Sequence, residues 1–280
     1  MKLFNFHTHS TFCDGHAVPE IFVDAAISAG MHALGFSAHA PVEPGYDWCI
    51  PKEKIQEYCN KIHELKNLHK EKLEIYCGLE ADYVPGYTQT FDYYKKTFPL
   101  DYIIGSIHLV QKKGFDEVWF IDGPEINYAL GLEMLFNNDI QLAVRHYYEQ
   151  TAAMVITQKP DVIGHFDKIK MNNKNRFFSE DEKWYQAIVS ETLDVIAKSG
   201  CILEVNTRGK YKMRTNDFFP SLSILALARE RNIPVTLSTD AHSPEELIYL
   251  LKEAAEALAS IGFREVFCFE NGNWKPTPIQ

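Results

Sequence analysis

Residues 3–9 read LFNFHTH, a short run of large apolar side chains that ends in two histidines separated by one residue. An apolar run of this length favours a buried β-strand. His7 and His9 would follow that strand directly, so both imidazoles would enter the loop at its carboxyl end. Alone, such a pair is a weak indication of a metal site, and its meaning depends on what the other strands carry.

The same arrangement recurs along the chain. Residues 235–242 read VTLSTDAH, so Asp240 and His242 follow an apolar strand as a carboxylate and an imidazole. Other possible ligands end or follow further short apolar runs: His16, His39, Glu80, His108 and His165. The carboxyl ends of strands in a rolled-up parallel sheet meet at one mouth, where we expect these side chains to gather. We assign no function to the histidines outside this pattern, His32, His63, His69 and His146.

Strand-like and helix-like segments alternate from end to end. Strands are expected at residues 3–6, 33–37, 73–77, 102–106, 161–164, 201–205, 234–238 and 265–269. Helices are expected at 19–29, 51–69, 88–97, 182–198, 222–231 and 244–261, and two more end near residue 158. Residues 111–127 are expected to form an irregular insertion.

Strands that alternate with helices of about 10–15 residues predict a parallel sheet. An open doubly wound sheet would concentrate its ligands at one switch point, whereas a barrel draws them from every strand. Because ligands here follow most of the expected strands, we predict an α/β fold with a closed or nearly closed TIM-like barrel. We expect a single domain that spans residues 1–280.

The composition limits the partners. The chain has 280 residues and a formal net charge of -10, and a surface of that sign repels phosphate backbones. We therefore expect no nucleic-acid partner. The sequence has no signal-peptide pattern and no run near the roughly 18 apolar residues that a membrane span needs, so we expect a cytoplasmic protein without membrane contact. The sequence does not indicate an oligomeric state.

The mixture of imidazoles and carboxylates suits Zn²⁺, Mn²⁺ or Fe²⁺ better than Ca²⁺ or Mg²⁺. A carboxylate can bridge two ions through its two oxygens, and Glu80 is our choice for that bridge. The loop FCDGH at residues 12–16 leaves two candidates, Asp14 and His16. We favour His16 as the ligand, with Asp14 bonded to it.

The order of these segments resembles the polymerase and histidinol phosphatase (PHP) superfamily, and within it the monofunctional histidinol-phosphatase branch. HxH and DxH are shared across the superfamily, whereas GLEADY and DYIIGSIH point to the phosphatase branch. The matching segments are HTHS (7–10), FCDGH (12–16), FSAHAP (36–41), GLEADY (78–83), DYIIGSIH (101–108), GHFD (164–167), EVNT (204–207) and STDAH (238–242).

The resemblance implies a distorted (β/α)7 barrel that holds three divalent metal ions. The implied activity is hydrolysis of L-histidinol phosphate to L-histidinol and phosphate in histidine biosynthesis, with a metal-bridging hydroxide as nucleophile. Glu80, Asp240 and His242 would form the catalytic set, with Asp240 or His242 placed for proton transfer. The implied metal ligands are His7, His9, His16, His39, Glu80, His108, His165, Asp240 and His242.

The small phosphate ester should also meet cations of the protein. Arg208 follows the strand at 201–205 and can bind phosphate through two nitrogens, while Lys168 and Arg214 are weaker candidates. Trp119 and Asp122 lie in the irregular insertion and would suit an imidazole-bearing substrate, as would Trp48. The competing interpretations are that Arg208 is a solvated loop residue without a ligand and that the tryptophans only anchor the packing of their loops.

Three other functions are possible: a phosphodiesterase or exonuclease of the same superfamily, a phosphatase for another small monoester, and a non-catalytic metal-binding module. The acidic charge counts against a nuclease. The large ligand set around an open mouth counts against a structural metal site, which would need fewer ligands.

Overall fold

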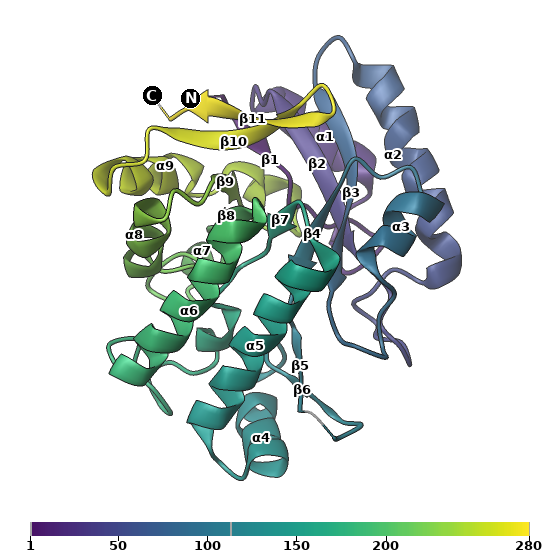
Figure 1. The fold of residues 1–280 in the computed structure, drawn as a ribbon. Helices are drawn as coiled ribbons and strands as arrows, with labels where there is room; N and C mark the ends of the chain where they lie inside the picture. Colours follow the sequence, from purple (N-terminus) through teal and green to yellow (C-terminus); the bar gives the residue numbers. More distant parts are fainter. Residues whose placement is uncertain (1, 113, 280) are drawn as a thin grey trace.

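The computed structural model describes residues 2–112 and 114–279 (Figure 1). Seven parallel strands form the main sheet, in the order β1-β2-β3-β4-β7-β8-β9. Their bounds are β1 (Phe4–Asn5), β2 (Ala33–His39), β3 (Glu74–Asp82), β4 (Tyr102–Ser106), β7 (Val162–Ile163), β8 (Ile202–Asn206) and β9 (Val235–Ser238).

The first and last strands of this sheet meet just beyond their carboxyl ends. Thr8 and Ala241 form a parallel bridge. The backbone N–H of His9 donates to the carbonyl of Ala241 (2.8 Å), and the N–H of Ala241 donates to the carbonyl of His7 (3.0 Å). The sheet is thus a distorted, nearly closed seven-stranded barrel, and the fold predicted from the sequence is confirmed.

Helices surround the outside of the sheet, and α5 and α6 pack side by side (Figure 1). In α6 the buried side chains recur at helical spacing, and Gly200, with a φ of 77°, ends the helix in the left-handed conformation that glycine adopts at little cost. Within the described residues, the helices are too short or too polar to cross a membrane. The helices are α1 (Pro19–Ser28), α2 (Ile55–His69), α3 (Phe91–Thr97), α4 (Glu125–Phe136), α5 (Ile140–Gln158), α6 (Lys183–Ser199), α7 (Arg208–Tyr211), α8 (Leu222–Glu230) and α9 (Leu251–Ser260), with 3₁₀ turns η1 (Lys52–Lys54), η2 (Lys168–Lys170) and η3 (Pro244–Ile248).

Tyr102 fills the interior of the barrel. Its hydroxyl lies 2.6 Å from the carbonyl of Phe6, just after β1, and 3.1 Å from that of Phe36, in the middle of β2, so it contacts two neighbouring segments of the sheet. The ring lies where Gly35 and Gly78 have no side chain. A Cβ on Gly78 would come within 2.5 Å of the ring, and one on Gly35 within 2.3 Å of the hydroxyl. The two glycines therefore make the space that the tyrosine occupies.

Of three local predictions, the last strand is confirmed and the other two are corrected. The strand expected at 265–269 forms as β10 (Glu265–Glu270), but it pairs antiparallel with β11 (Asn273–Pro278) and is not part of the barrel sheet, which the Thr8–Ala241 bridge already closes. The insertion at 111–127 is partly regular, with a hairpin of β5 (Leu109–Gln111) and β6 (Val118–Phe120) before α4. Glu80 lies inside β3, not beyond it, because pairing with β4 extends β3 to Asp82.

Candidate metal centre

The carboxyl end of the barrel gathers all but one of the predicted metal ligands. His7 and His9 follow β1, His39 ends β2, and His108 and His165 come just after β4 and β7. Asp240 and His242 follow β9 and lie beside residues 7–9 through the backbone bonds that close the barrel. Most of these side chains are fully buried, and His39 and His242 are 7% and 8% exposed.

Glu80 stands at the middle of the group, with each carboxylate oxygen facing a different set of imidazoles. Its Oε2 lies 3.0 Å from His7 Nε2, 3.0 Å from His39 Nδ1 and 3.4 Å from His9 Nε2. Its Oε1 lies 2.8 Å from His165 Nε2 and 3.6 Å from His108 Nε2. This arrangement is what a bridge between two ions requires. Burial alone would raise the pKa of Glu80, but the surrounding histidines hold that pKa well below its usual value.

Asp240 adopts a backbone conformation that few residues with a side chain adopt, with a φ of 51°. Neighbours hold it there: the amide of Asn206 donates to Oδ2 (3.3 Å), and Arg208 Nη1 donates to the carbonyl oxygen (2.7 Å). The other oxygen, Oδ1, lies 3.5 Å from His9 Nε2 and 3.8 Å from His7 Nε2. Strain of this kind tends to occur where side-chain placement serves function.

The loop at residues 12–16 turns Asp14 inward and His16 outward. Asp14 Oδ2 lies 3.2 Å from His242 Nε2, and Oδ1 lies 3.8 Å from both His9 Nδ1 and His39 Nε2. His16 is exposed and takes part only through its backbone N–H, which donates to the carbonyl of His242 (2.7 Å). The turn therefore brings the Asp14 side chain, and not that of His16, into the candidate ligand group. The structure corrects the preference for His16 in favour of Asp14.

The donor set fits divalent metal ions. Ligand atoms that are each about 2.0–2.2 Å from one ion lie about 3–3.5 Å apart, close to many of the separations above. Three groups bring one ligand atom from each residue within 4.8 Å of the others: His9, Asp14, His39 and His242; His7, His9 and Asp240; and His39, Glu80 and His108. Among the described residues, His7 Nε2, His9 Nε2 and His39 Nδ1 are buried without a hydrogen-bond partner. Burial also lowers the pKa of His9 and His39 to about 4, which keeps both imidazoles in the neutral form that binds metals.

Two buried carboxylates orient the imidazoles from behind. Glu204 Oε1 lies 2.5 Å from His7 Nδ1, and its Oε2 accepts the backbone N–H of His165 (2.7 Å). Asp82 accepts both the backbone N–H of His108 (2.7 Å) and, at 2.8 Å, its Nδ1. Sequence reasoning gave these two residues no role. The available signal was a charged residue inside an apolar strand, as in ILEVN at residues 202–206.

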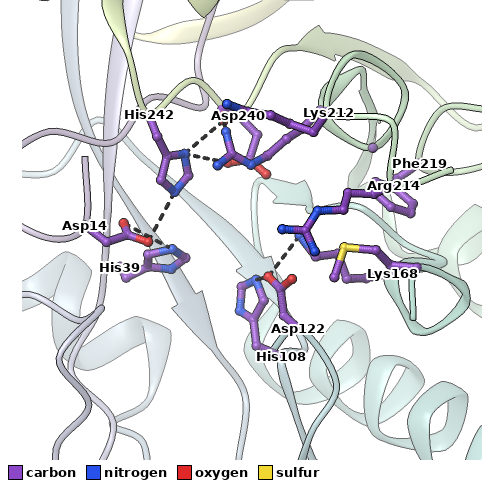
Figure 2. A pocket seen from close by; sticks show the side chains of 13 residues that line it. Asp14, His39, His108, Asp122, Lys168, Lys212, Arg214, Phe219, Asp240 and His242 are labelled. Atoms are coloured by element: carbon purple, nitrogen blue, oxygen red, sulfur yellow. Dashed lines mark hydrogen bonds and ion pairs between the residues drawn. The ribbon is translucent and has the colours of Figure 1, made fainter. Parts of the chain in front are cut away.

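A pocket of about 300 Å³ opens above the metal ligands (Figure 2). In the figure, Asp14, His39 and His242 lie across the pocket from Lys168 and Arg214. Asp122 also lines the pocket, with Oδ2 3.0 Å from Lys168 Nζ and 3.8 Å from His108 Nε2. The remaining cations of the lining are Arg208 and Lys212. A pocket with basic side chains facing a metal-ligand group suits a small anion.

Trp119 does not reach this pocket, and the expectation that it contacts a substrate is corrected. Its ring is 1% exposed, its Nε1 donates to the carbonyl of Tyr128 (3.0 Å), and it packs closely over Gly131 of α4. The ring is thus an anchor between the β5–β6 hairpin and α4. Trp48 instead packs edge-on against His39, one of the candidate metal ligands, with ring centroids 4.9 Å apart.

The PHP domain family matches residues 5–208. The chain belongs to the PHP domain family. Asp240 and His242 lie beyond the matched residues, and the structure brings them into the candidate metal centre.

Two curated relatives align with most of the chain. One, named "Probable histidinol-phosphatase", is from Deinococcus radiodurans and is 30% identical over 93% of this chain and 94% of its own. The histidinol-phosphatase of Bacillus subtilis is 24% identical over 87% of this chain and 94% of its own. These relatives place the chain in the histidinol-phosphatase branch of the family.

A solved structure shares the fold. The histidinol phosphate phosphatase of Lactococcus lactis, in complex with Zn, L-histidinol and phosphate, superposes with a TM-score of 0.72. The two chains are 22% identical, and the match covers 98% of this chain and 99% of the other. At this identity the likeness supports the barrel architecture.

Proposed function

We propose that this PHP domain is a metal-dependent phosphomonoesterase that hydrolyses L-histidinol phosphate to L-histidinol and phosphate. The observation that carries the proposal is a group of buried metal ligands around Glu80 beneath a pocket lined by lysines and arginines. The names of the curated relatives, and the L-histidinol and phosphate in the Lactococcus lactis structure, support this substrate.

We assign three ions to the residues of these overlapping groups, which share His9 and His39, with Glu80 as the bridge and His165 beside its Oε1. Each imidazole would bind one ion, while the two oxygens of Glu80 would bind two. The mixed nitrogen and oxygen donors suit zinc, manganese or iron. When bound, such ions make water a strong nucleophile at neutral pH and neutralise the charge of a phosphate ester.

The cations of the pocket bind the phosphate. Arg208 offers several N–H groups in one plane, and its bond to the carbonyl of Asp240 directs it toward the metal centre. Burial opposes the charge of Lys168, but Asp122 and Asp240 raise the pKa of its ammonium above the usual value, so it remains a cation at neutral pH. Both side chains would neutralise phosphate oxygens that do not face the metals.

Asp122 gives the pocket a negative group for the cationic end of the substrate. Burial would raise its pKa, but Lys168 and His108 hold the pKa below its usual value, so the carboxylate stays charged. L-histidinol phosphate carries an amine and an imidazole, and either can pair with this carboxylate. We assign proton transfer to the leaving oxygen to either Asp240 or His242, which both line the pocket.

The test is phosphate release by the metal-loaded protein from L-histidinol phosphate and from a panel of other phosphate esters. We expect kcat/KM for L-histidinol phosphate to exceed that for an aryl phosphate by about 100-fold, roughly 2.7 kcal/mol of discrimination. The Glu80→Gln variant, which removes the proposed bridge, is the negative control. Equal rates on both esters would refute the substrate assignment, and degradation of labelled single-stranded DNA at physiological salt would favour a nuclease.

A further inference from the structure

Glu246 is a buried carboxylate at the start of η3, where that turn contacts α7. It is 3% exposed. Its Oε2 accepts the backbone N–H groups of His242 (2.8 Å) and Ser243 (3.2 Å). The side chain also forms ion pairs with Arg208, whose Nη1 lies 3.3 Å from Oε2, and with Lys212 through Oε1. One carboxylate thus links the backbone of a metal-ligand residue to two cations of the pocket.

Arg208 and Lys212 both line the pocket above the candidate metal centre, and both form an ion pair with Glu246. Arg208 is the more constrained of the two, because its Nη1 also donates to the carbonyl of Asp240 (2.7 Å). Two cationic side chains and two backbone N–H groups surround Glu246, and these are the partners that a charged carboxylate takes. The carboxylate is therefore charged when the pocket binds an anion.

The contacts of Glu246 also have a purely structural explanation, which has to be distinguished from a role in anion binding. Ser243 and Glu246 form a capping box at the start of η3, in which the glutamate side chain accepts the N–H of the capping serine. A capping box needs a side-chain oxygen at this position, and glutamine supplies one as well as glutamate. It does not need a negative charge, and it does not explain why two cations from another element meet at the same carboxylate.

We propose that Glu246 is a positioning residue for anion binding: its charge holds Arg208 and Lys212 side by side at the pocket and fixes them to the His242 segment. This inference rests on the proposed function, since it assigns to the two cations the binding of the phosphate group. Without the negative charge, the two cations would repel each other and turn toward solvent. The pocket would then bind phosphate less tightly, while the metal ligands kept their places.

The test uses Glu246→Gln, which preserves the capping box and removes the charge. We expect KM for L-histidinol phosphate and the inhibition constant of inorganic phosphate to rise about tenfold, with kcat within about threefold of the wild type. Metal content per chain and the unfolding midpoint should stay near the wild-type values. The matched control is Glu245→Gln at the exposed neighbouring position, which should change none of these quantities.

A double-mutant cycle with Arg208→Ala shows whether the effect passes through the arginine. In the Arg208→Ala background, Glu246→Gln should weaken phosphate binding by less than about threefold, because only Lys212 is then left for the carboxylate to position. The inference is overturned if Glu246→Gln leaves both phosphate constants unchanged, if it lowers metal content, or if its full effect persists in that background. Binding of inorganic phosphate, measured by calorimetry, remains a readout even if the wild type hydrolyses no ester, so failure of the proposed function is recognised separately.

Discussion

Glu204 Oε1 lies 2.5 Å from Nδ1 of His7, and both side chains are fully buried. A carboxylate at this nitrogen fixes the proton on Nδ1 and leaves Nε2, which faces Glu80, free to bind a metal. Without the carboxylate, the imidazole could take the other tautomer or rotate.

Glu204→Gln should therefore lower metal affinity by about 10–100-fold, the usual effect of losing a partner behind a metal-bound histidine. Competition with a chelator followed by elemental analysis measures the loss. Glu191→Gln, at an exposed position of α6, is the control and should bind metal like the wild type. Unchanged affinity in Glu204→Gln would show that His7 needs no such partner.

Asp14 and His16 are distinguished by a pair of substitutions. Asp14→Asn should reduce the number of metal ions per chain, because Asp14 lies among His9, His39 and His242. His16→Asn should retain the wild-type number, since its side chain is exposed and its backbone bond to His242 is unaffected. Metal loss in His16→Asn together with full occupancy in Asp14→Asn would return the assignment to His16.

Arg208→Ala should raise KM for the phosphate ester by about 10–100-fold, because a hydrogen bond between charged groups contributes roughly 1.5–3 kcal/mol. Arg208→Lys should have an intermediate effect, since it keeps the charge but loses the planar fork. Steady-state kinetics measure both variants. Lys252→Ala is the control, because that side chain is 89% exposed on the outside of α9. If KM stays constant in both arginine variants, the phosphate binds elsewhere.

Removal of metal should destabilise the fold, because the ions bind a ligand group that only the folded chain assembles. With free metal at about 1,000 times its dissociation constant, binding adds about 4 kcal/mol, or roughly 8–16 °C in the unfolding midpoint. Calorimetry with and without a chelator measures this shift. Added zinc or manganese should restore the midpoint, and magnesium should not. An unfolding midpoint that stays the same when the chelator is added would contradict a metal centre in this fold.

Gly78→Ala should cost about 1–3 kcal/mol of unfolding free energy, because the new Cβ would overlap the ring of Tyr102. Chemical denaturation measures the cost. Combining it with Tyr102→Leu should cost less than the sum of the two single changes, since the smaller side chain relieves the overlap. Strictly additive losses would show that the glycine matters for another reason.

The barrel and the gathering of most candidate ligands at its mouth could be predicted from the sequence because both follow local patterns. An apolar run predicts a strand whether or not its partners are known, and a histidine at its end lies at the mouth in any parallel barrel. His39, His108 and His165 illustrate this, since each lies where its strand ends. The position of Glu80 inside β3 depended on pairing with β4 and was missed.

The remaining features depend on the exact course of a loop or on contacts between distant segments. Asp14 turns inward because the N–H groups of Cys13 and Gly15 both donate to the carbonyl of Ser10, and no residue spacing reveals that turn. Trp119 is a residue type that often lines a substrate-binding loop. Its ring is instead buried against α4, in the space left by the missing side chain of Gly131. The sequence around an aromatic residue does not show whether it packs inside the protein or contacts a substrate. For Trp119 the answer depends on Gly131, which lies on another element.

The backbone bonds between residues 7–9 and Ala241 join the two ends of the barrel through the metal centre itself. During synthesis, the first two histidines emerge early, while Asp240 and His242 emerge only after β9. A growing chain therefore cannot assemble its complete set of ligands until the barrel strands have been made. Binding of the full set of metal ions would therefore follow synthesis of the last barrel strand.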